Sequence, residues 1–139
     1  FTVYGPWGRP DMAMFIFTKK ILAGEPIPVF NNGNMKRDFT YIDDIISGTR
    51  SAIDKNYDCE IFNFGNHRSE QLMDVISLIE KNLNKNAQIE FLPMQPGDVP
   101  ESFADIERSI AMLNYQPLID VDVGIKRLID WYMNYFNKK

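Results

Sequence analysis

Apolar residues recur at helical spacing in three stretches of the chain. In each stretch they stand at positions i, i+3, i+4, i+7 and i+11, which predicts a helix with one apolar face. The three sets are Ile42, Ile45, Ile46, Thr49 and Ile53; Leu72, Val75, Ile76, Ile79 and Leu83; and Ile125, Leu128, Ile129, Tyr132 and Phe136. We expect the last set, within a helix over residues 123–136, to point inward.

Residues with known preferences for helix ends support these helices and a fourth one. Ser69 is suited to cap the second periodic stretch. Asp43 and Asp44 stand at the positive end of the first stretch, and we interpret this acidic pair as structural. Pro10-Asp11 opens an apolar stretch that runs through Ala23 with Gly24 just past it, which is the usual punctuation of a helix.

Short apolar and β-branched runs between the helices predict strands. These runs cover residues 1–4, 27–30, 38–42, 61–64 and 89–92, and a short helix is expected over 106–113. Asn31-Asn32-Gly33-Asn34 tolerates positive φ and predicts a turn, and residues 93–100 predict an irregular loop. Such an alternation indicates an α/β fold, or an α+β-like small domain, whose strands are too few for a large independent sheet.

Composition narrows the class of protein. The 139 residues are 45% hydrophobic and 24% charged, which is typical of one packed domain or part of a larger one. The longest apolar run, residues 12–17, is far shorter than the roughly 20 residues of a membrane-spanning helix. Fifteen basic against 19 acidic residues give a net charge of −4, which argues against a broad nucleic-acid footprint. The single Cys59 excludes an internal disulfide, makes a metal site improbable and favours a reducing cytoplasm.

Several catalytic arrangements are missing from the sequence. There is no Gly-x-Gly-x-x-Gly or Gly-x-x-x-x-Gly-Lys loop, so any nucleotide cofactor is expected to bind elsewhere. The Tyr-x-x-x-Lys spacing from Tyr135 to Lys139 ends on the last residue, and we interpret it as coincidence. His67, the only histidine, lies in a polar run and is interpreted as solvated surface. The chain begins at Phe1 without a leader, which we interpret as the start of an excised piece.

Four ordered motifs carry a resemblance to a known family. They are Phe1-Thr2-Val3-Tyr4-Gly5-Pro6 with Arg9-Pro10-Asp11-Met12-Ala13; Arg37-Asp38-Phe39-Thr40-Tyr41-Ile42-Asp43-Asp44; Asn63-Phe64-Gly65; and Gln95-Pro96-Gly97-Asp98-Val99-Pro100. In this order, across essentially the whole chain, they resemble the C-terminal part of the NAD-dependent nucleotide-sugar epimerases of the extended short-chain dehydrogenase/reductase family. The UDP-glucuronate 4-epimerases are the most similar subgroup.

The resemblance implies that two halves of a longer enzyme have different functions. In that family a Rossmann half binds NAD and carries the catalytic Tyr-Lys pair, so residues 1–139 would be the substrate-binding domain, beginning at the tail of a Rossmann strand. We therefore expect no catalytic, cofactor-binding or metal-binding residue here, and an inactive fragment. We also expect residues 1–7, which would face the Rossmann half, to be exposed or to be buried by a crystal or dimer neighbour. The full-length enzyme would be a cytoplasmic homodimer that serves cell-surface polysaccharide synthesis, with no nucleic-acid or membrane partner.

The resemblance also implies roles in binding UDP. Phe30, with the backbone around Val29, would lie against the uracil, although Phe30 is equally suited to a core. Arg37 would pair with the diphosphate, unless it forms a salt bridge to Asp38 or Asp43. Asp98 would accept hydrogen bonds from the ribose, unless it lies in a solvated turn with Gly97. Many related epimerases have arginine where this chain has Gln95, so UDP binding would depend more on Arg37.

Thr2 and Arg9 carry the expectation about the sugar. Oxidation of a glucuronate at carbon 4 gives a β-keto acid that readily loses carbon dioxide, so its carboxylate must be held while the ring turns over. Arg9, just before the expected helix start at Asp11, would bind that carboxylate with the helix N-terminus, and Thr2 would donate a hydroxyl. The alternative is that Arg9 is a surface residue. Met12 lies close enough in sequence to line the same pocket.

Other functions remain open at this level. A UDP-glucuronate decarboxylase, or an epimerase of neutral or N-acetylated sugars, would share the uridine contacts. A non-catalytic module that binds nucleotide sugars would share them too.

Overall fold

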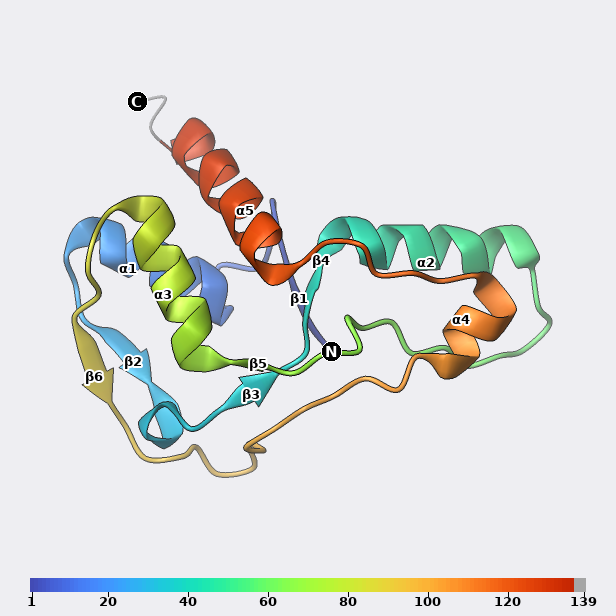
Figure 1. The fold of residues 1–139 in the computed structure, drawn as a ribbon, viewed down its shortest axis with the longest axis horizontal. Helices are drawn as coiled ribbons and strands as arrows, with labels where there is room; N and C mark the ends of the chain where they lie inside the picture. Colours follow the sequence, from blue (N-terminus) through green and yellow to red (C-terminus); the bar gives the residue numbers. More distant parts are fainter. Residues whose placement is uncertain (137–139) are drawn as a thin grey trace.

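Three pairs of short strands organise the fold of residues 1–136, which are the residues that this computed structural model describes (Figure 1). β1 (Thr2–Tyr4) lies parallel to β4 (Phe39–Tyr41), with Val3 opposite Thr40. β2 (Ile27–Val29) lies parallel to β6 (Ile89–Phe91). β3 (Lys36–Arg37) lies antiparallel to β5 (Glu70–Gln71). The mixed helix and strand content confirms the expected α/β class.

The helices lie in two groups. α1 (Ala13–Ala23), α3 (Leu72–Leu83) and α5 (Val121–Phe136) pack together, while α2 (Ile42–Lys55) and α4 (Glu107–Leu113) form an arm that extends to the right in Figure 1. No helix within residues 1–136 is long and apolar enough to cross a membrane.

The main core lies between α1, α3 and α5. It contains the predicted apolar faces of two helices: the buried residues are Val75, Ile76 and Ile79 of α3, and Ile125, Leu128, Ile129 and Tyr132 of α5. Phe136, which we expected to point inward, is 44% exposed, although its ring still contacts Phe15 of α1 and Tyr132. A smaller cluster beneath α2 consists of Ala104, Ile106, Leu113 and Tyr115.

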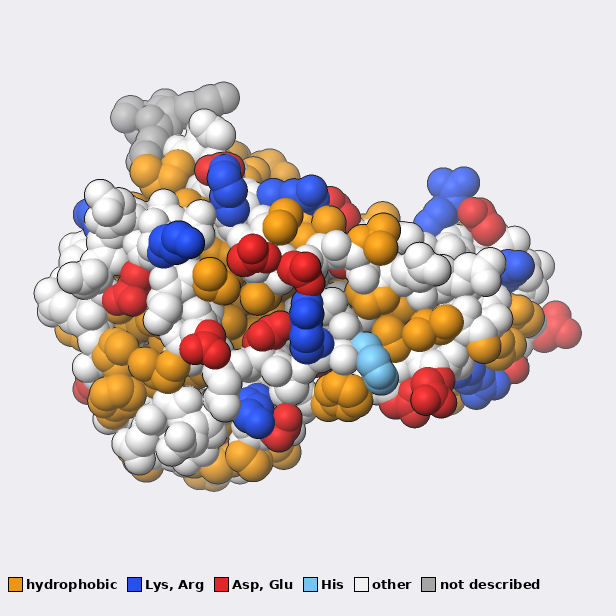
Figure 2. All heavy atoms as spheres, viewed as in Figure 1, with side chains coloured by type: hydrophobic (Ala, Val, Ile, Leu, Met, Phe, Trp, Pro, Cys, Tyr) orange, Lys and Arg blue, Asp and Glu red, His pale blue; other side chains and the backbone are white. Residues whose placement is uncertain are grey.

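The apolar face predicted for α2 is covered only near the start of the helix, where Ile42 packs against the main core and Ile45 is half-buried. Ile46 and Ile53 are 58% and 68% exposed, whereas Asp44 and Gly48 are buried. The reason is close packing, because a Cβ on Gly48 would lie 2.6 Å from the ring of Phe64. The exposed Ile46 and Ile53 add apolar surface to the arm. Figure 2 shows hydrophobic side chains on the face of the arm that it draws.

Several predicted boundaries are wrong, each for a local reason. α1 begins at Ala13 rather than at residues 10–11, because a turn closed by Met12 N–H on the carbonyl of Arg9 comes first. Ser69 caps no helix, since β5 precedes α3. Residues 61–64 form no strand, because their backbone bonds to the α4 region instead: Ser109 Oγ donates to Asn63 O at 2.5 Å.

The N-terminal stretch is exposed only in part. Phe1 and Trp7 are 53% and 72% exposed, as expected, but Tyr4 is buried and contacts Phe39 and Tyr41 edge to face. The turn expected at residues 31–34 is present as a 3-10 helix over Phe30–Gly33, in which Asn31 and Asn32 have φ of 50° and Gly33 has φ of 83°. Phe30 belongs to this turn and not to β2.

Candidate functional site

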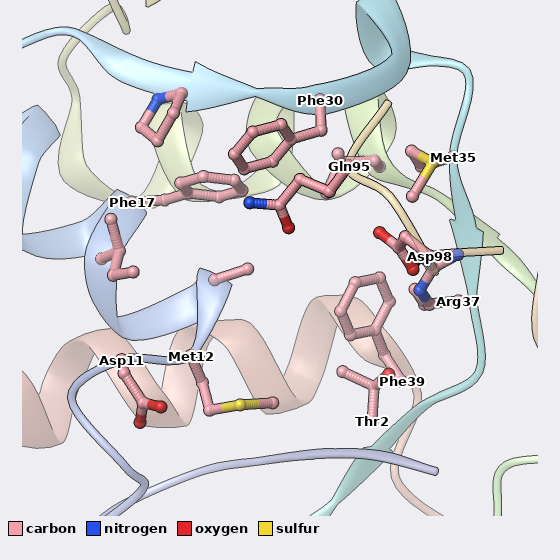
Figure 3. A pocket seen from close by; sticks show the side chains of 14 residues that line it. Thr2, Asp11, Met12, Phe17, Phe30, Met35, Arg37, Phe39, Gln95 and Asp98 are labelled. Atoms are coloured by element: carbon pink, nitrogen blue, oxygen red, sulfur yellow. Dashed lines mark hydrogen bonds and ion pairs between the residues drawn. The ribbon is translucent and has the colours of Figure 1, made fainter. Parts of the chain in front are cut away.

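A cavity of about 360 Å³ opens where α1, the Phe30 turn, β3 and the loop 93–100 meet (Figure 3). Apolar side chains form most of its wall, and Arg37, Asp98, Gln95, Thr2 and Asp11 bring polar groups to it. Five of the seven residues predicted to bind substrate therefore line one cavity: Thr2, Phe30, Arg37, Gln95 and Asp98. Their sequence positions are far apart, and the fold brings them together.

Phe30 forms part of the cavity wall beside Pro28 and Phe17 (Figure 3). The left-handed conformation of Asn31 and Asn32 turns the chain directly after this ring. Val29, the other residue expected near the base, has a fully buried side chain, and its carbonyl oxygen accepts a hydrogen bond from Leu92 N–H at 2.9 Å. Val29 thus positions Phe30 but presents no side chain to the cavity.

Arg37 and Asp98 form an ion pair within the cavity. Arg37 Nη2 donates to Asp98 Oδ1 at 2.6 Å, and Nη1 donates to the backbone oxygen of Lys36 at 2.8 Å. The salt bridge considered at the sequence level, to Asp38 or Asp43, is wrong, because Asp38 is buried elsewhere and Asp43 lies 3.4 Å from Arg127. Two residues expected to bind different parts of one ligand therefore bind each other.

A turn in the loop presents Asp98 and Gln95 to the cavity. Asp98 N–H donates to Gln95 O at 3.2 Å, and Gly97 between them has φ of 82°, which favours glycine. This confirms the expectation that Gly97 allows the backbone to turn. Gln95 extends its amide into the open part of the cavity (Figure 3).

Asp38 is a buried carboxylate that sequence analysis did not single out. Its side chain has no exposed surface, and it accepts hydrogen bonds from Asn66 N–H at 2.6 Å, Ala104 N–H at 3.1 Å and the Thr40 hydroxyl at 3.0 Å. Through these hydrogen bonds, Asp38 joins the backbone next to Arg37 to the segments that contain Asn66 and Ala104. The sequence placed Asp38 at the start of the predicted strand over residues 38–42 and suggested it only as an alternative partner of Arg37.

Arg9 lies outside the main cavity. Its guanidinium is exposed and forms a two-point pair with Asp11, with Nε 3.0 Å from Oδ1, and this hydrogen bond lowers the pKa of the Asp11 carboxyl. Arg9 lines a smaller hollow of about 30 Å³, shared with Thr2 and Met12. Because α1 begins only at Ala13, the expected combination of Arg9 with a helix N-terminus at Asp11 is not formed.

His67 and Tyr135, the other residues weighed for catalysis, do not line the cavity. His67 is exposed, as expected, and its Nδ1 lies 3.0 Å from Ala104 O. Within residues 1–136, no three His, Cys, Asp or Glu side chains are grouped as metal ligands would be. Tyr135 lies at the end of α5, and Lys139 of the Tyr-x-x-x-Lys spacing lies outside the described residues.

Nothing in the described residues fits a dinucleotide cofactor. Its cradle needs a strand, a glycine-rich turn and a helix N-terminus in sequence. The turn after β1 contains Gly5 and Gly8, but the side chain of Ile42 fills the space beside Gly5, where a Cβ would lie 2.5 Å from it. The turn after β1 therefore does not form such a cradle.

Comparison with known proteins shows which family this chain resembles. Residues 1–65 match the model of the NAD dependent epimerase/dehydratase family. The chain is 53% identical to the uncharacterized protein MJ1055 of Methanocaldococcus jannaschii, covering 96% of this chain and 41% of that protein. It is 39% identical to UDP-glucuronate 4-epimerase 4 of Arabidopsis thaliana, covering 99% of this chain and 35% of that enzyme.

A solved structure agrees with the sequence matches. UDP-glucuronic acid 4-epimerase from Bacillus cereus, in complex with UDP-glucuronic acid and NAD, is 36% identical and superposes with a TM-score of 0.92, covering 98% of this chain and 44% of that one. The chain thus spans less than half the length of the relatives it matches. These matches confirm the resemblance to part of an NAD-dependent nucleotide-sugar epimerase.

Proposed function

We propose that this chain, which is similar to part of an NAD-dependent nucleotide-sugar epimerase, is the substrate-binding domain of an enzyme that inverts carbon 4 of UDP-glucuronate. The observation that carries the proposal is the grouping of Phe30, Arg37 and Asp98 around one cavity of about 360 Å³. An aromatic wall, a guanidinium and a carboxylate suit the base, the diphosphate and the ribose of UDP.

The UDP end of the ligand would lie along the upper part of the cavity in Figure 3. Phe30 offers its ring to the uracil, and Arg37 offers a planar fork to two phosphate oxygens. Gln95 offers a neutral amide where many relatives have a second guanidinium, so Arg37 carries most of the charge complementarity to the diphosphate.

The sugar end would lie towards Thr2 and Met12. Both residues line the main cavity and the smaller hollow that contains Arg9, so the two spaces adjoin each other. Arg9 is exposed and its pair with Asp11 is screened by solvent, so its guanidinium can leave Asp11 for the glucuronate carboxylate at small cost. Holding that carboxylate protects a 4-keto intermediate from losing carbon dioxide.

Residues outside this chain would supply the rest of the enzyme. NAD, which takes up and returns the hydride of carbon 4, would be bound there together with the catalytic Tyr-Lys pair. Residues 1–139 alone would therefore be inactive. We assign the full-length enzyme to the cytoplasm as a homodimer that provides nucleotide sugars for polysaccharide synthesis.

The test is an epimerisation assay on the full-length protein with NAD. We expect UDP-glucuronate to be converted to its 4-epimer, and Arg9→Ala to reduce kcat/KM for it by about 100-fold, since a hydrogen bond to a charged group contributes about 1.5–3 kcal/mol. Activity of Arg9→Ala on UDP-glucose should stay within about twofold of the original. Equal loss with both sugars would contradict the role of Arg9.

Rival functions predict different products in the same assay. Release of carbon dioxide and a UDP-pentose would identify a decarboxylase. Conversion of UDP-glucose but not UDP-glucuronate would identify an epimerase of neutral sugars. Tight binding of UDP-sugars without any turnover would identify a binding module.

A further inference from the structure

The guanidinium in the cavity is already paired with a carboxylate of the same cavity. Arg37 Nη2 lies 2.6 Å from Asp98 Oδ1, and the two side chains are only 16% and 32% exposed. Figure 3 shows them side by side at one end of the cavity, where Arg37 is the basic side chain among those drawn. An anion that enters the cavity therefore meets a cation that is already neutralised.

The backbone fixes this pairing in place. Lys36 N–H donates to Pro100 O at 2.8 Å, which joins the end of the loop to the residue before Arg37. Val99 N–H donates to Asp98 Oδ1 at 2.8 Å, so the same oxygen serves the loop and the guanidinium. Among the described residues, Oδ2 of Asp98 has no hydrogen-bond donor and remains available to a ligand.

A carboxylate and a phosphate use the same oxygen geometry on a guanidinium. A phosphate that binds Arg37 must therefore displace the Asp98 carboxylate or share the guanidinium with it. If inorganic diphosphate took Arg37, the partly buried Asp98 carboxylate would lose its ion-pair partner and would have a second negative charge beside it. Both effects oppose binding. A nucleoside diphosphate brings ribose hydroxyls that can donate to that carboxylate and offset the loss.

We propose that Asp98 is a specificity-determining residue, which masks Arg37 from simple anions and favours diphosphates that carry a ribose. This inference rests on the proposed binding of UDP in the same cavity. It assigns Asp98 a role in rejecting ligands, in addition to the contact that the resemblance implies. Selectivity of this kind comes from an interaction that opposes the wrong ligand.

The test compares pyrophosphate and UDP as probes by calorimetric titration of the full-length protein. Asp98→Asn removes the charge and keeps the size of the side chain, and Asp98→Ser provides a second variant. We expect both variants to bind pyrophosphate about tenfold more tightly than the original protein and to bind UDP no more tightly. The ratio of the two affinities is the measured specificity.

A matched control separates masking from a general change in charge. Glu101, in the same loop region, is exposed and lies 3.9 Å from Lys36 Nζ rather than at Arg37. Glu101→Gln removes the same charge, and we expect it to change the affinity for pyrophosphate by less than about twofold.

The outcomes distinguish this inference from the proposed function. If the original protein binds UDP but the Asp98 variants bind pyrophosphate no more tightly, or no more than Glu101→Gln does, the inference is wrong and the proposed function stands. If the original protein fails to bind UDP while the Asp98 variants gain pyrophosphate binding, the proposed function and the preference for a ribose are wrong, and only the masking of Arg37 from simple anions stands. If neither pyrophosphate nor UDP binds to the original protein or to any variant, both the inference and the proposed function are wrong.

Discussion

At the scale of single residues, buried carboxylates hold the framework around the cavity. Asp38 and Asp44 each accept hydrogen bonds from backbone N–H groups of segments far away in the sequence: Asp38 from Asn66 and Ala104, and Asp44 from Leu118 and Ile119. The long connecting segments form little strand pairing, and these hydrogen bonds to buried carboxylates hold their backbone in place. The interpretation of Asp44 as structural is thereby confirmed.

Removing the Asp38 carboxylate should destabilise the fold strongly. Asp38→Ala leaves buried N–H groups and a hydroxyl without an acceptor, so we expect the free energy of unfolding in urea to fall by about 3 kcal/mol. Asp43→Ala is the control, since Asp43 is an exposed neighbour on the same segment, and its loss should stay below about 1 kcal/mol. Equal losses in the two variants would show that Asp38 is not a framework residue.

At the scale of elements, apolar periodicity predicted where the helices lie, but it did not always predict which segments pack against them. The buried faces of α3 and α5 follow from apolar spacing, because these helices pack against other parts of this chain. The isoleucine stripe of α2 has the same spacing, but Ile46 and Ile53 are exposed, and Gly48 is the residue that packs closely against Phe64. Spacing predicts an apolar face and cannot say which segment covers it.

Gly48 should therefore resist replacement even inside a helix. Alanine is favoured over glycine there by about 1 kcal/mol of helix propensity, but its Cβ would lie 2.6 Å from the Phe64 ring and 2.9 Å from Tyr115. We expect Gly48→Ala to lower the free energy of unfolding by about 1–2 kcal/mol, because overpacking outweighs propensity. Ser47→Ala, at the exposed neighbouring position, should instead be neutral or slightly stabilising. Stabilisation by Gly48→Ala would contradict the close packing.

The candidate site was predictable to the extent that residues lie in recognisable motifs. Thr2, Phe30, Arg37, Gln95 and Asp98 were expected from motifs and share one cavity. The Arg37–Asp98 pair was not expected, because the two residues stand 61 positions apart and no local pattern links them. The contact of Arg9 with Asp11 was missed because the helix was expected to begin two residues too early.

At the scale of the whole molecule, buried tyrosines join the two cores to the connecting segments. Tyr115 donates its hydroxyl to Gly65 O at 2.9 Å, and Tyr4 donates to Val121 O at 3.4 Å. Burial raises the pKa of both phenols above their ordinary value of about 10, and nearby carboxylates raise each pKa further. Both side chains are nearly inaccessible to solvent, so the folded chain holds them neutral.

This arrangement predicts a loss of stability in alkali. Above about pH 10 the unfolded chain releases phenolic protons that the folded chain retains, so the free energy of unfolding falls by about 1.4 kcal/mol per pH unit for each such tyrosine. The contribution is fully present below pH 10. Urea unfolding at pH 9, 10 and 11 measures it. Tyr115→Phe should be less stable at pH 9, through loss of its hydrogen bond, but should lose less stability between pH 10 and 11, and an unchanged slope would contradict the assignment.

The central claim is that the cavity around Arg37 binds the UDP part of a nucleotide sugar. Titration of UDP into the full-length protein, its Arg37→Ala variant and its Arg50→Ala variant tests this claim most directly, because Arg50 is an exposed arginine of α2 paired with Asp54 and does not line the cavity. We predict binding by the original protein and by Arg50→Ala, and a loss of at least about 30-fold with Arg37→Ala, as expected for a charge-assisted contact to phosphate. Undiminished UDP binding by Arg37→Ala would contradict the claim.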